Sequence, residues 1–298
     1  MKKLLQRLFT PVAALLTLGS AGPAAAKGPA VKPALWAIAD ADTTIYLFGT
    51  IHVLPEKYQW RTTKFDRAVE GSGQLVVETI VDEKNPTGIV AAMQKLAFSP
   101  GLPPIAERVP PAKRKALAAA IAKSGVPRAA FDNMETWAAG FLLLGNQFKQ
   151  MGLQGGQGVE AVLRSDFLSD GKPIGELETN IEQLGYFDRL SEKAQRNFLE
   201  GAIMEVPSTK KQFSGMLSAW ARGDVAAIAR SFDKDLESSP EMKQALMKQR
   251  NANWSRWIED RMTKPGTIML AVGAGHLAGK DSVIELLKRD GYTVSRVQ

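Results

Sequence analysis

Short hydrophobic runs near both ends of the chain predict the strands of a central sheet. Residues 34–38 and 43–50 are rich in apolar, β-branched and aromatic side chains, and the short Asp-containing segment between them predicts a hairpin. The runs at residues 75–77 and 267–272 do not alternate with polar residues, so we expect strands that are buried on both faces. A last strand is expected at residues 292–297.

Between these strands, hydrophobic residues recur at helical spacing in five long segments. These segments cover residues 110–124, 128–150, 158–169, 179–204 and 242–263. Strands that are separated by long helices need crossover connections, which predicts an α/β fold with a central, mainly parallel β-sheet flanked by helices. The segment from about residue 84 to 240 is nearly all helical, and we expect this large helical insert to form a cap over the sheet.

The N-terminus has the pattern of a secretory signal peptide. Three of the first seven residues are Lys or Arg, residues 8–19 are mostly apolar, and Ala24 to Ala26 supply the small residues of a cleavage site. The apolar run is shorter than the ~20 residues that a membrane-spanning helix needs. We therefore expect cleavage after Ala26, a single mature domain at residues 27–298 and a periplasmic or secreted location. The alternative is an uncleaved membrane anchor.

Composition and charge exclude several classes of site. The chain has no cysteine, which rules out disulfides, iron–sulfur clusters, thiolate zinc sites and cysteine nucleophiles. Its formal net charge is +7, and removal of residues 1–26, with three basic and no acidic residues, lowers it to +4. No basic stripe alternates with aromatic residues, so we expect no nucleic-acid partner. His52 and His276 are the only imidazoles, and any metal must use them or carboxylates.

Both histidines occupy the same kind of position in the predicted sheet. His52 ends the segment Gly49-Thr50-Ile51-His52 and His276 ends Gly273-Ala274-Gly275-His276, and each segment follows a predicted strand. Glycine lets the chain turn sharply at a strand end without a Cβ clash, and the following side chain then projects over the carboxyl edge of the sheet. Ligands bind at this edge in open α/β sheets. A lone histidine is more often a core residue, but two matching placements favour a functional role.

Glu78 is the acid that best completes such a site. It follows the predicted strand at residues 75–77, so a shared sheet brings it to the same edge as the histidines. Two histidines and one carboxylate form a ligand set for a hydrolytic divalent metal with an open position for water. The alternative is a structural role, in which Glu78 caps a turn or pairs with an arginine.

Two further acids are weaker candidates. Glu160 follows a glycine-rich segment that has neither a phosphate-binding lysine nor a preceding strand, so this segment is not a P-loop or a dinucleotide-binding turn. Glu160 can still bring a carboxylate to the site from the first turn of a helix, where the helix dipole also favours an acid. Glu178 lies where a short strand at residues 173–177 meets the next helix, and a helix cap or structural pairing explains it equally well.

Arg250 and Asn251 are candidate polar groups of the cleft. Arg250, Trp254 and Trp257 are spaced by four and three residues and share one face of a helix, with Asn251 beside them. Arg250 can bind a carboxylate or a carbonyl oxygen, and Asn251 can donate to an oxyanion. The alternative is two core tryptophans flanked by solvated polar residues, and the residue types favour neither.

Together, these motifs resemble the TraB/GumN family over about residues 34–297. The resemblance rests on the order of the two G-x-x-H segments, Glu78, Gly158-Val159-Glu160, Leu177-Glu178-Thr179 and Arg250-Asn251-x-x-Trp254. It implies an α/β fold in which His52, His276 and Glu78 form one divalent-metal site, with Arg250 and Asn251 as the family's polar pair. The family also includes the Tiki metalloproteases, and it is related to erythromycin-esterase-like and ChaN-like proteins. One departure is Glu160, because the family has Asp there about as often as Glu.

The sequence therefore predicts an exported hydrolase that depends on a divalent metal ion such as Mn, Co, Zn or Fe, with peptides or proteins as substrates. In this reading His52, His276 and Glu78 bind the ion, and the water on it is activated for attack on a carbonyl group. Glu78 can instead act as general base, with Glu160 or Glu178 as the third ligand. The H-E-x-x-H motif of the common zinc proteases is not in the sequence.

Two alternatives remain open at the level of the sequence. One is a non-catalytic periplasmic protein that binds a peptide or protein in the same cleft, because a fold does not by itself carry an activity. The other is an esterase-like hydrolase without a metal, in which His52 or His276 acts as general base.

Overall fold

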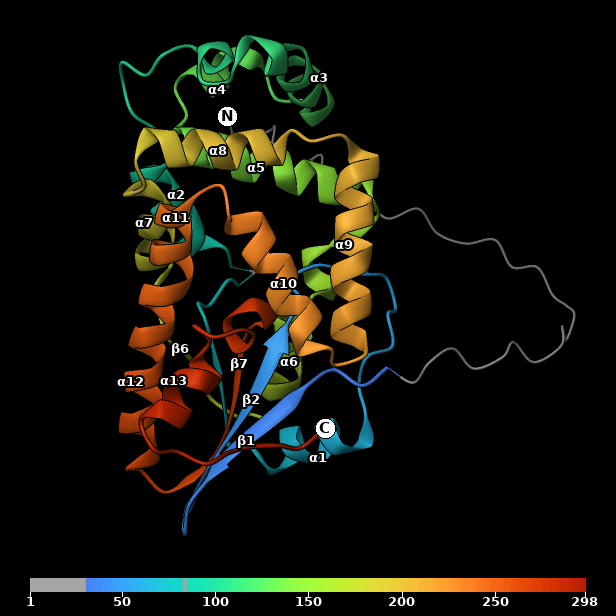
Figure 1. Ribbon diagram of the computed structural model, residues 1–298, viewed down its shortest axis with the longest axis vertical. Coiled ribbons are helices and arrows are strands. Elements are labelled where there is room, and N and C mark those ends of the chain that lie inside the picture. The colour runs from blue at the N-terminus through green and yellow to red at the C-terminus, as the bar shows by residue number, and fades with distance from the viewer. Residues whose placement is uncertain (1–30, 83–84) are drawn as a thin grey trace, which may run out of the picture. The chain divides into compact units, whose positions relative to one another are not determined.

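The computed structural model describes residues 31–82 and 85–298 and contains a six-stranded mixed sheet, which lies in the lower half of the view in Figure 1. Its strands run in the order β6-β4-β7-β2-β1-β8. Their bounds are β1 Leu35–Ala39, β2 Thr43–Thr50, β4 Gln74–Val77, β6 Ile174–Glu176, β7 Gly266–Gly273 and β8 Val294–Arg296. A two-stranded sheet joins β3 (Leu54–Pro55) to β5 (Leu153–Gln154).

The four strands β6, β4, β7 and β2 are parallel, whereas β1 and β8 are antiparallel to their neighbours. Thr50 at the end of β2 lies opposite Gly273 at the end of β7, and Val77 at the end of β4 lies opposite Ala271. The carboxyl ends of the parallel strands therefore meet at one edge. This arrangement confirms the expected α/β fold with a mainly parallel sheet.

An aspartate side chain stabilises the turn of the first hairpin by accepting hydrogen bonds from two backbone N–H groups. Asp40 Oδ1 accepts hydrogen bonds from the backbone N–H groups of Asp42 (3.1 Å) and Thr43 (2.8 Å). Asparagine and aspartate favour turns for this reason. The turn joins β1 to β2 as the expected hairpin, in which Ile38 pairs with Ile45.

Helices cover both faces of the sheet. The first face packs against α1 (Thr63–Gly71), α6 (Val159–Ser169), α9 (Val206–Ala221) and α10 (Val225–Leu236). The second face packs against α12 (Arg250–Met262) and α13 (Val283–Arg289). Adjacent side chains of β2 enter opposite cores, since Phe48 belongs to the first and Leu47 to the second. Such burial on both faces explains the unbroken apolar runs of β4 and β7, whereas β2 also contains threonines.

The insert between β4 and α11 is mostly helical, as expected, and it has a hydrophobic core of its own that includes Trp137 and Leu199. Its remaining helices are α2 (Thr87–Leu96), α3 (Arg114–Ser124), α4 (Arg128–Asp132), α5 (Thr136–Gln150), α7 (Asn180–Asp188) and α8 (Glu192–Ala202). The short turns η2 (Ile105–Glu107) and η3 (Pro111–Lys113) precede α3, η4 (Gly155–Gln157) precedes α6, and η6 (Ala274–Leu277) follows β7. The insert also supplies β6 to the main sheet and β5 to the small one, so it is not purely a cap.

Two segments predicted as single helices are each divided in two. Residues 128–150 break between α4 and α5, where the buried guanidinium of Arg108 binds the backbone carbonyls of Asp132 and Met134. Residues 179–204 break between α7 and α8, where Ser191 caps the second helix by accepting a hydrogen bond from Ala194 N–H (3.3 Å). Side-chain groups that satisfy helix ends make such breaks stable.

The predicted helix at residues 242–263 begins earlier and changes its geometry along its length. It starts as α11 (Pro240–Met242), continues as the π-helical segment η5 (Lys243–Gln249) and becomes regular in α12. In the described residues, no helix is long and apolar enough to cross a bilayer. The predicted signal peptide, residues 1–26, lies outside the described residues.

Candidate functional site

The carboxyl edge of the parallel strands gathers the side chains that the sequence singles out. His52 follows β2, Glu78 follows β4, Glu178 follows β6 and His276 follows β7. The pairing of β4 and β6 continues past the strand ends, because Glu178 N–H donates to the carbonyl of Glu78 (2.9 Å). The strand-end positions therefore bring these four residues to one place, as expected for open α/β sheets.

Gly273 lies at the centre of this group. Its backbone N–H donates to Glu78 Oε1 (2.6 Å). A Cβ atom placed on Gly273 would lie 3.0 Å from Glu78 Oε1, 3.6 Å from His276 Cδ2 and 3.6 Å from His52 Nε2. The three side chains thus surround a space that only a residue without a side chain leaves open.

His276 is buried, and both of its ring nitrogens have partners. Nδ1 lies 2.6 Å from Asn251 Oδ1, and Nε2 lies 3.2 Å from Arg250 Nη1. Asn251 donates from its Nδ2 to the carbonyl of Asp281 (2.7 Å), so its oxygen faces the ring. The hydrogen-bond pattern therefore assigns the proton of His276 to Nδ1 and a lone pair to Nε2. Burial lowers the pKa of His276 to about 3, which keeps the ring neutral at physiological pH.

Arg250 connects the two carboxylates of the site. Its Nη2 donates to Glu78 Oε2 (2.7 Å), and its Nε lies 3.0 Å from both carboxylate oxygens of Glu178. The indole N–H of Trp254 donates to Glu178 Oε1 (2.9 Å), and the guanidinium lies over the Trp254 ring at 4.6 Å. One guanidinium between two ionised carboxylates leaves a net negative charge, which favours a cation nearby.

The two carboxylates respond differently to this environment. Burial alone would raise the pKa of Glu78, but the charge of Arg250 and the neighbouring imidazoles hold it well below its usual range. Burial raises the pKa of Glu178 although Arg250 and Trp254 donate hydrogen bonds to it. Glu78 is therefore the more firmly ionised of the pair and the better donor for a metal ion.

His52 is exposed, unlike His276, and 68% of the His52 side chain is accessible to solvent. Its Nδ1 lies 2.7 Å from Glu160 Oε1, and the hydroxyl of Thr50 donates to the same carboxylate oxygen. The Glu160 carboxylate raises the pKa of His52 to about 9. This pair fixes the orientation of the ring with Nε2 toward Gly273, and the raised pKa keeps that nitrogen protonated at neutral pH, so a metal ion has to displace its proton.

The glycine-rich segment before α6 holds Glu160 against His52. Val159 N–H donates to the carbonyl of Ile51 (3.0 Å), which joins the start of α6 to the chain just after β2. A Cβ atom on Gly158 would lie 2.1 Å from the carbonyl oxygen of His52. The glycine is needed here for close contact between two backbone segments.

All the side chains expected at the site lie at this edge, but their contacts differ from some expectations. Arg250 and Asn251 are buried and bind protein groups, so neither is the solvated residue of the structural alternative. Glu160 contacts His52. Two contributors were missed: the hydroxyl of Thr50, and Gln183 of α7, whose Nε2 donates to Glu78 Oε2 (3.2 Å). Thr50 is the last residue of its strand, which is a signal that sequence reasoning can use, whereas Gln183 has none.

The donor atoms fit a divalent ion in their chemistry. Each imidazole has one nitrogen held by an oxygen, as in metal-binding histidines, and His52 Nε2 and His276 Cδ2 are the ring atoms nearest the space at Gly273. Glu78 Oε1 lies 3.9 Å from His276 Nε2. The atoms are not drawn together around an ion: in residues 31–82 and 85–298, no group of three or more His, Asp or Glu side chains is arranged to hold a metal. Arg250 Nη1 faces the nitrogen of His276 that would bind one.

Comparison with known proteins finds the same family that the sequence motifs resemble. The chain matches the TraB/PrgY/gumN family over residues 34–296. It is 23% identical over 245 residues to the uncharacterized protein YbaP of Escherichia coli (strain K12), covering 82% of this chain and 87% of that protein. The YbaP protein of Shigella flexneri is similar to the same extent. No solved structure matches the chain. The match over nearly all of the described residues shows that this protein belongs to the TraB/PrgY/gumN family.

Proposed function

We propose that this protein is an exported hydrolase that binds a divalent metal ion through His52, Glu78 and His276 and cleaves peptides or proteins. One observation carries the proposal. Each histidine has one ring nitrogen held by its own oxygen partner and directs the other side of its ring toward Gly273, beside an ionised, buried carboxylate. Pairs of this kind set both the tautomer and the orientation of metal-binding imidazoles.

The residues around this set have supporting roles in the proposal. Asn251 keeps the proton of His276 on Nδ1, and Glu160 holds the ring of His52. Arg250 keeps Glu78 ionised and in place, and Glu178 balances the charge of Arg250. When bound, a divalent ion lowers the pKa of a water molecule and polarises a carbonyl group. Glu78 serves either as a ligand or as the base that takes a proton from the attacking water.

The exposed side chain of His52 marks the open side of the site, and the proposed peptide substrate class rests on the family resemblance. His52 is accessible, while Glu78, Arg250 and His276 lie buried behind it, so a substrate approaches from the His52 side. A signal peptide at residues 1–26 would bring the protein to the periplasm or the exterior, where it meets exported chains.

The test is a digest of a peptide library by purified, chelator-treated protein with and without added Mn²⁺, Co²⁺ or Zn²⁺. We expect cleavage only with an ion, and none from the His276→Ala variant. Lys64→Ala, at an exposed position of α1, is the matched control and should keep full activity. No cleavage with any ion, together with saturable peptide binding, would favour the alternative of a non-catalytic binding or regulatory protein.

A metal-independent hydrolase is the second candidate, because one contact favours it. Arg250 Nη1 lies 3.2 Å from His276 Nε2 and so already places a positive charge where an ion would bind. The pair of exposed His52 and half-buried Glu160 would then supply general acid–base chemistry. Full activity after removal of all metal by a chelator would favour this candidate over the first.

A further inference from the structure

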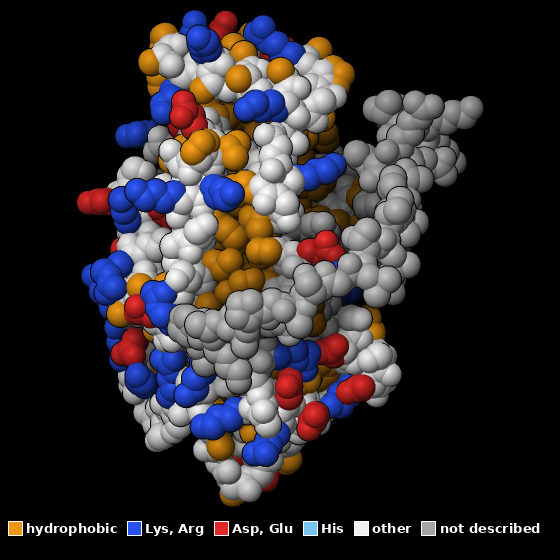
Figure 2. Space-filling model, turned by 90° about the vertical axis from the view of Figure 1, so that its right-hand side faces the viewer, with side chains coloured by type: hydrophobic (Ala, Val, Ile, Leu, Met, Phe, Trp, Pro, Cys, Tyr) orange, Lys and Arg blue, Asp and Glu red, His pale blue; other side chains and the backbone are white. Residues whose placement is uncertain are grey.

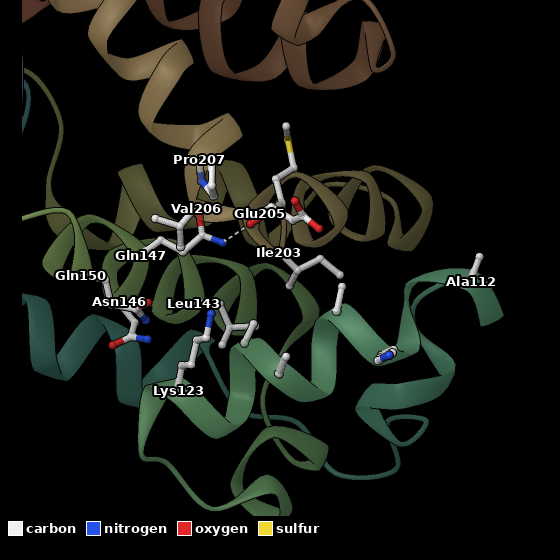
Figure 3. A pocket seen from close by; sticks show the side chains of 15 residues that line it. Ala112, Lys123, Leu143, Asn146, Gln147, Gln150, Ile203, Glu205, Val206 and Pro207 are labelled. Carbon is white, nitrogen blue, oxygen red and sulfur yellow. Dashed lines mark hydrogen bonds between the residues drawn. The ribbon is translucent and has the colours of Figure 1, made fainter.

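Helix α3 is flanked by a cavity on each of two opposite faces, and neither cavity is lined by the histidines, acids or Arg250 of the candidate site. The first, here called the α3–α5 groove, has a volume of about 590 Å³ and lies between α3, α5 and residues 203–207 (Figure 3). The second, here called the η2–α3 cavity, has a volume of about 570 Å³ and lies between η2, the other face of α3 and residues 126–128. Both volumes are in the range of small-molecule sites, roughly 300–1,000 Å³.

The η2–α3 cavity has an aliphatic floor. Ile105, Leu117 and Ile121 are buried at its base, and Ala118 and Ala122 form its wall. The side chains that line it include no aromatic ring, so it offers no surface for stacking a planar ligand. Its shape and chemistry suit a flexible hydrocarbon chain, which gains free energy by leaving water.

The rim of the same cavity is cationic. Arg114, Lys115 and Arg128 are its only charged lining residues, and all three are exposed. The surrounding segment, residues 111–128, has five Lys or Arg and no Asp or Glu. In Figure 2, Lys and Arg side chains gather with hydrophobic ones at the upper end of the view, where Figure 1 has α3 and α4. The rim is therefore complementary to a single negative charge.

The α3–α5 groove differs in the polar groups that line it. Figure 3 shows Lys123, Asn146 and Gln150 at one end of the groove and Ala112 at the other. Lys115, which lines both cavities, and Glu205 add charges of opposite sign to the same lining. Because this groove mixes charges of both signs with amides, it lacks the one-sided charge of its neighbour and serves as an internal comparison.

We infer that the η2–α3 cavity is a binding site for a linear aliphatic anion, a single hydrocarbon chain with a carboxylate head group. The chain lies on Ile105, Leu117 and Ile121, and the carboxylate meets Arg114, Lys115 and Arg128 at the rim. Charge-assisted hydrogen bonds from arginine to a carboxylate give this end its specificity. The site is independent of the proposed hydrolase activity.

The test is calorimetric titration of the whole protein with dodecanoate below its micelle concentration. We expect one saturable site. Dodecyltrimethylammonium, which has the same chain and a positive head group, should bind at least about tenfold more weakly, because its charge is repelled by the rim. Equal binding of the two amphiphiles, or no binding of dodecanoate, would overturn the inference.

Two adjacent alanines give a matched pair of variants. Ala118 lines the η2–α3 cavity and Ala119 lines the α3–α5 groove, and both are exposed on α3. Ala118→Phe fills the proposed site and should weaken dodecanoate binding by about tenfold or more, whereas Ala119→Phe should change it less than about twofold. Equal losses from both variants would mean that the ligand does not occupy this cavity.

A second pair tests the charge without filling the cavity. Arg128→Glu reverses a rim charge and should weaken binding by about tenfold or more, while Lys113→Glu, in the same basic segment but outside both cavities, should have little effect. Thermal melts check that each variant folds, and dodecanoate should raise the melting temperature of the folded controls. If the wild type bound vesicles of anionic phospholipid but not dodecanoate, the segment would be a membrane-binding surface and the inference would be wrong.

Discussion

Arg250 is a buried charge whose contribution depends on both of its carboxylate partners. Its side chain is 7% exposed, and those of Glu78 and Glu178 are similarly buried. Removing charges from water costs several kcal/mol per ion, and only close, well-paired partners offset the cost. The guanidinium supplies such pairing to two acids at once, so its loss would leave two carboxylates without a counter-charge in a buried site.

Replacement of this guanidinium should therefore destabilise the fold. We expect Arg250→Met to lower the free energy of unfolding by about 3–5 kcal/mol, because the volume is kept while both carboxylates lose their partner. Urea denaturation measures this change. Arg256→Met on the same helix is the control. Arg256 is exposed, and its hydrogen bond within residues 31–82 and 85–298 is to Asn253, so its loss should change stability by less than about 0.5 kcal/mol. Similar stabilities of the two variants would show that the Arg250 pairs add nothing.

Asn251 should determine how well His276 binds a metal ion. The Asn251→Ala variant leaves Nδ1–H of His276 without its acceptor, so the ring is free to change its tautomer and orientation. Loss of such a partner typically weakens metal binding by about 10–100-fold. Calorimetric titration with Mn²⁺ or Zn²⁺ measures the affinity, and Asn253→Ala, which loses contacts to Tyr186 and Arg256 outside the site, should keep it. An unchanged affinity in Asn251→Ala would exclude a positioning role for Asn251.

Among the elements, the start of α6 has the tightest backbone contact of the site. Gly158 packs against the carbonyl of His52, and this contact sets where α6 begins and hence where Glu160 lies. A helix N-terminus is well suited to an acid, but only the close approach brings that acid to His52. The glycine-rich segment thus positions the carboxylate of Glu160.

We expect Gly158→Ala to destabilise the protein by about 1–3 kcal/mol, because the new methyl group overlaps a backbone oxygen and the start of α6 must shift. Gly145→Ala is the matched control. Gly145 lies exposed within α5, where a Cβ meets nothing within 4 Å, and alanine there should stabilise the helix by about 0.5–1 kcal/mol. Opposite shifts of the two urea midpoints are the expected result, and equal shifts would contradict the close contact.

Strands were easier to predict than helix breaks, for a physical reason. The runs that form β4 and β7 are apolar because both of their faces are covered, and this property is visible in the local sequence. The break after α4 depends on a partner elsewhere, because Arg108 is 24 residues away from the carbonyl of Asp132 that it binds. At the break after α7, Ser191 caps α8 locally and also donates to Glu241, which is 50 residues away. The helices α9 and α10 were not predicted, although Trp220 and Ile228 are buried against the sheet.

Across the whole molecule, the parallel sheet assembles the site from distant parts of the chain. The strand-end rule predicted that His52, Glu78 and His276 meet at one edge, since it needs only the positions of strands and glycines. It could not predict that Arg250 faces His276 or that Gln183 binds Glu78, because these contacts depend on how α12 and α7 pack. Topology is therefore readable from the sequence here, while the pairing of charges is not.

If the two histidines serve one ion, metal binding should depend on the whole sheet rather than on either segment alone. An ion that binds only the folded protein raises its melting temperature by mass action. We expect saturating Mn²⁺ or Zn²⁺ to raise the melting temperature of the wild type, and His52→Ala and His276→Ala each to abolish most of that rise. Glu78→Gln should do the same if Glu78 is a ligand, but should remove only turnover if it is the base.

The controls for this experiment separate lost binding from lost stability. His52 is exposed, so His52→Ala should leave the melting temperature without metal nearly unchanged, whereas His276→Ala opens a buried cavity and should lower it. The quantity compared is therefore the rise caused by the ion in each variant. Two single variants that each kept the full rise would show that the histidines share no ion. The ends of β2 and β7 would then lie side by side without forming a metal site. The metal-independent hydrolase would replace the metal-dependent one as the proposed function.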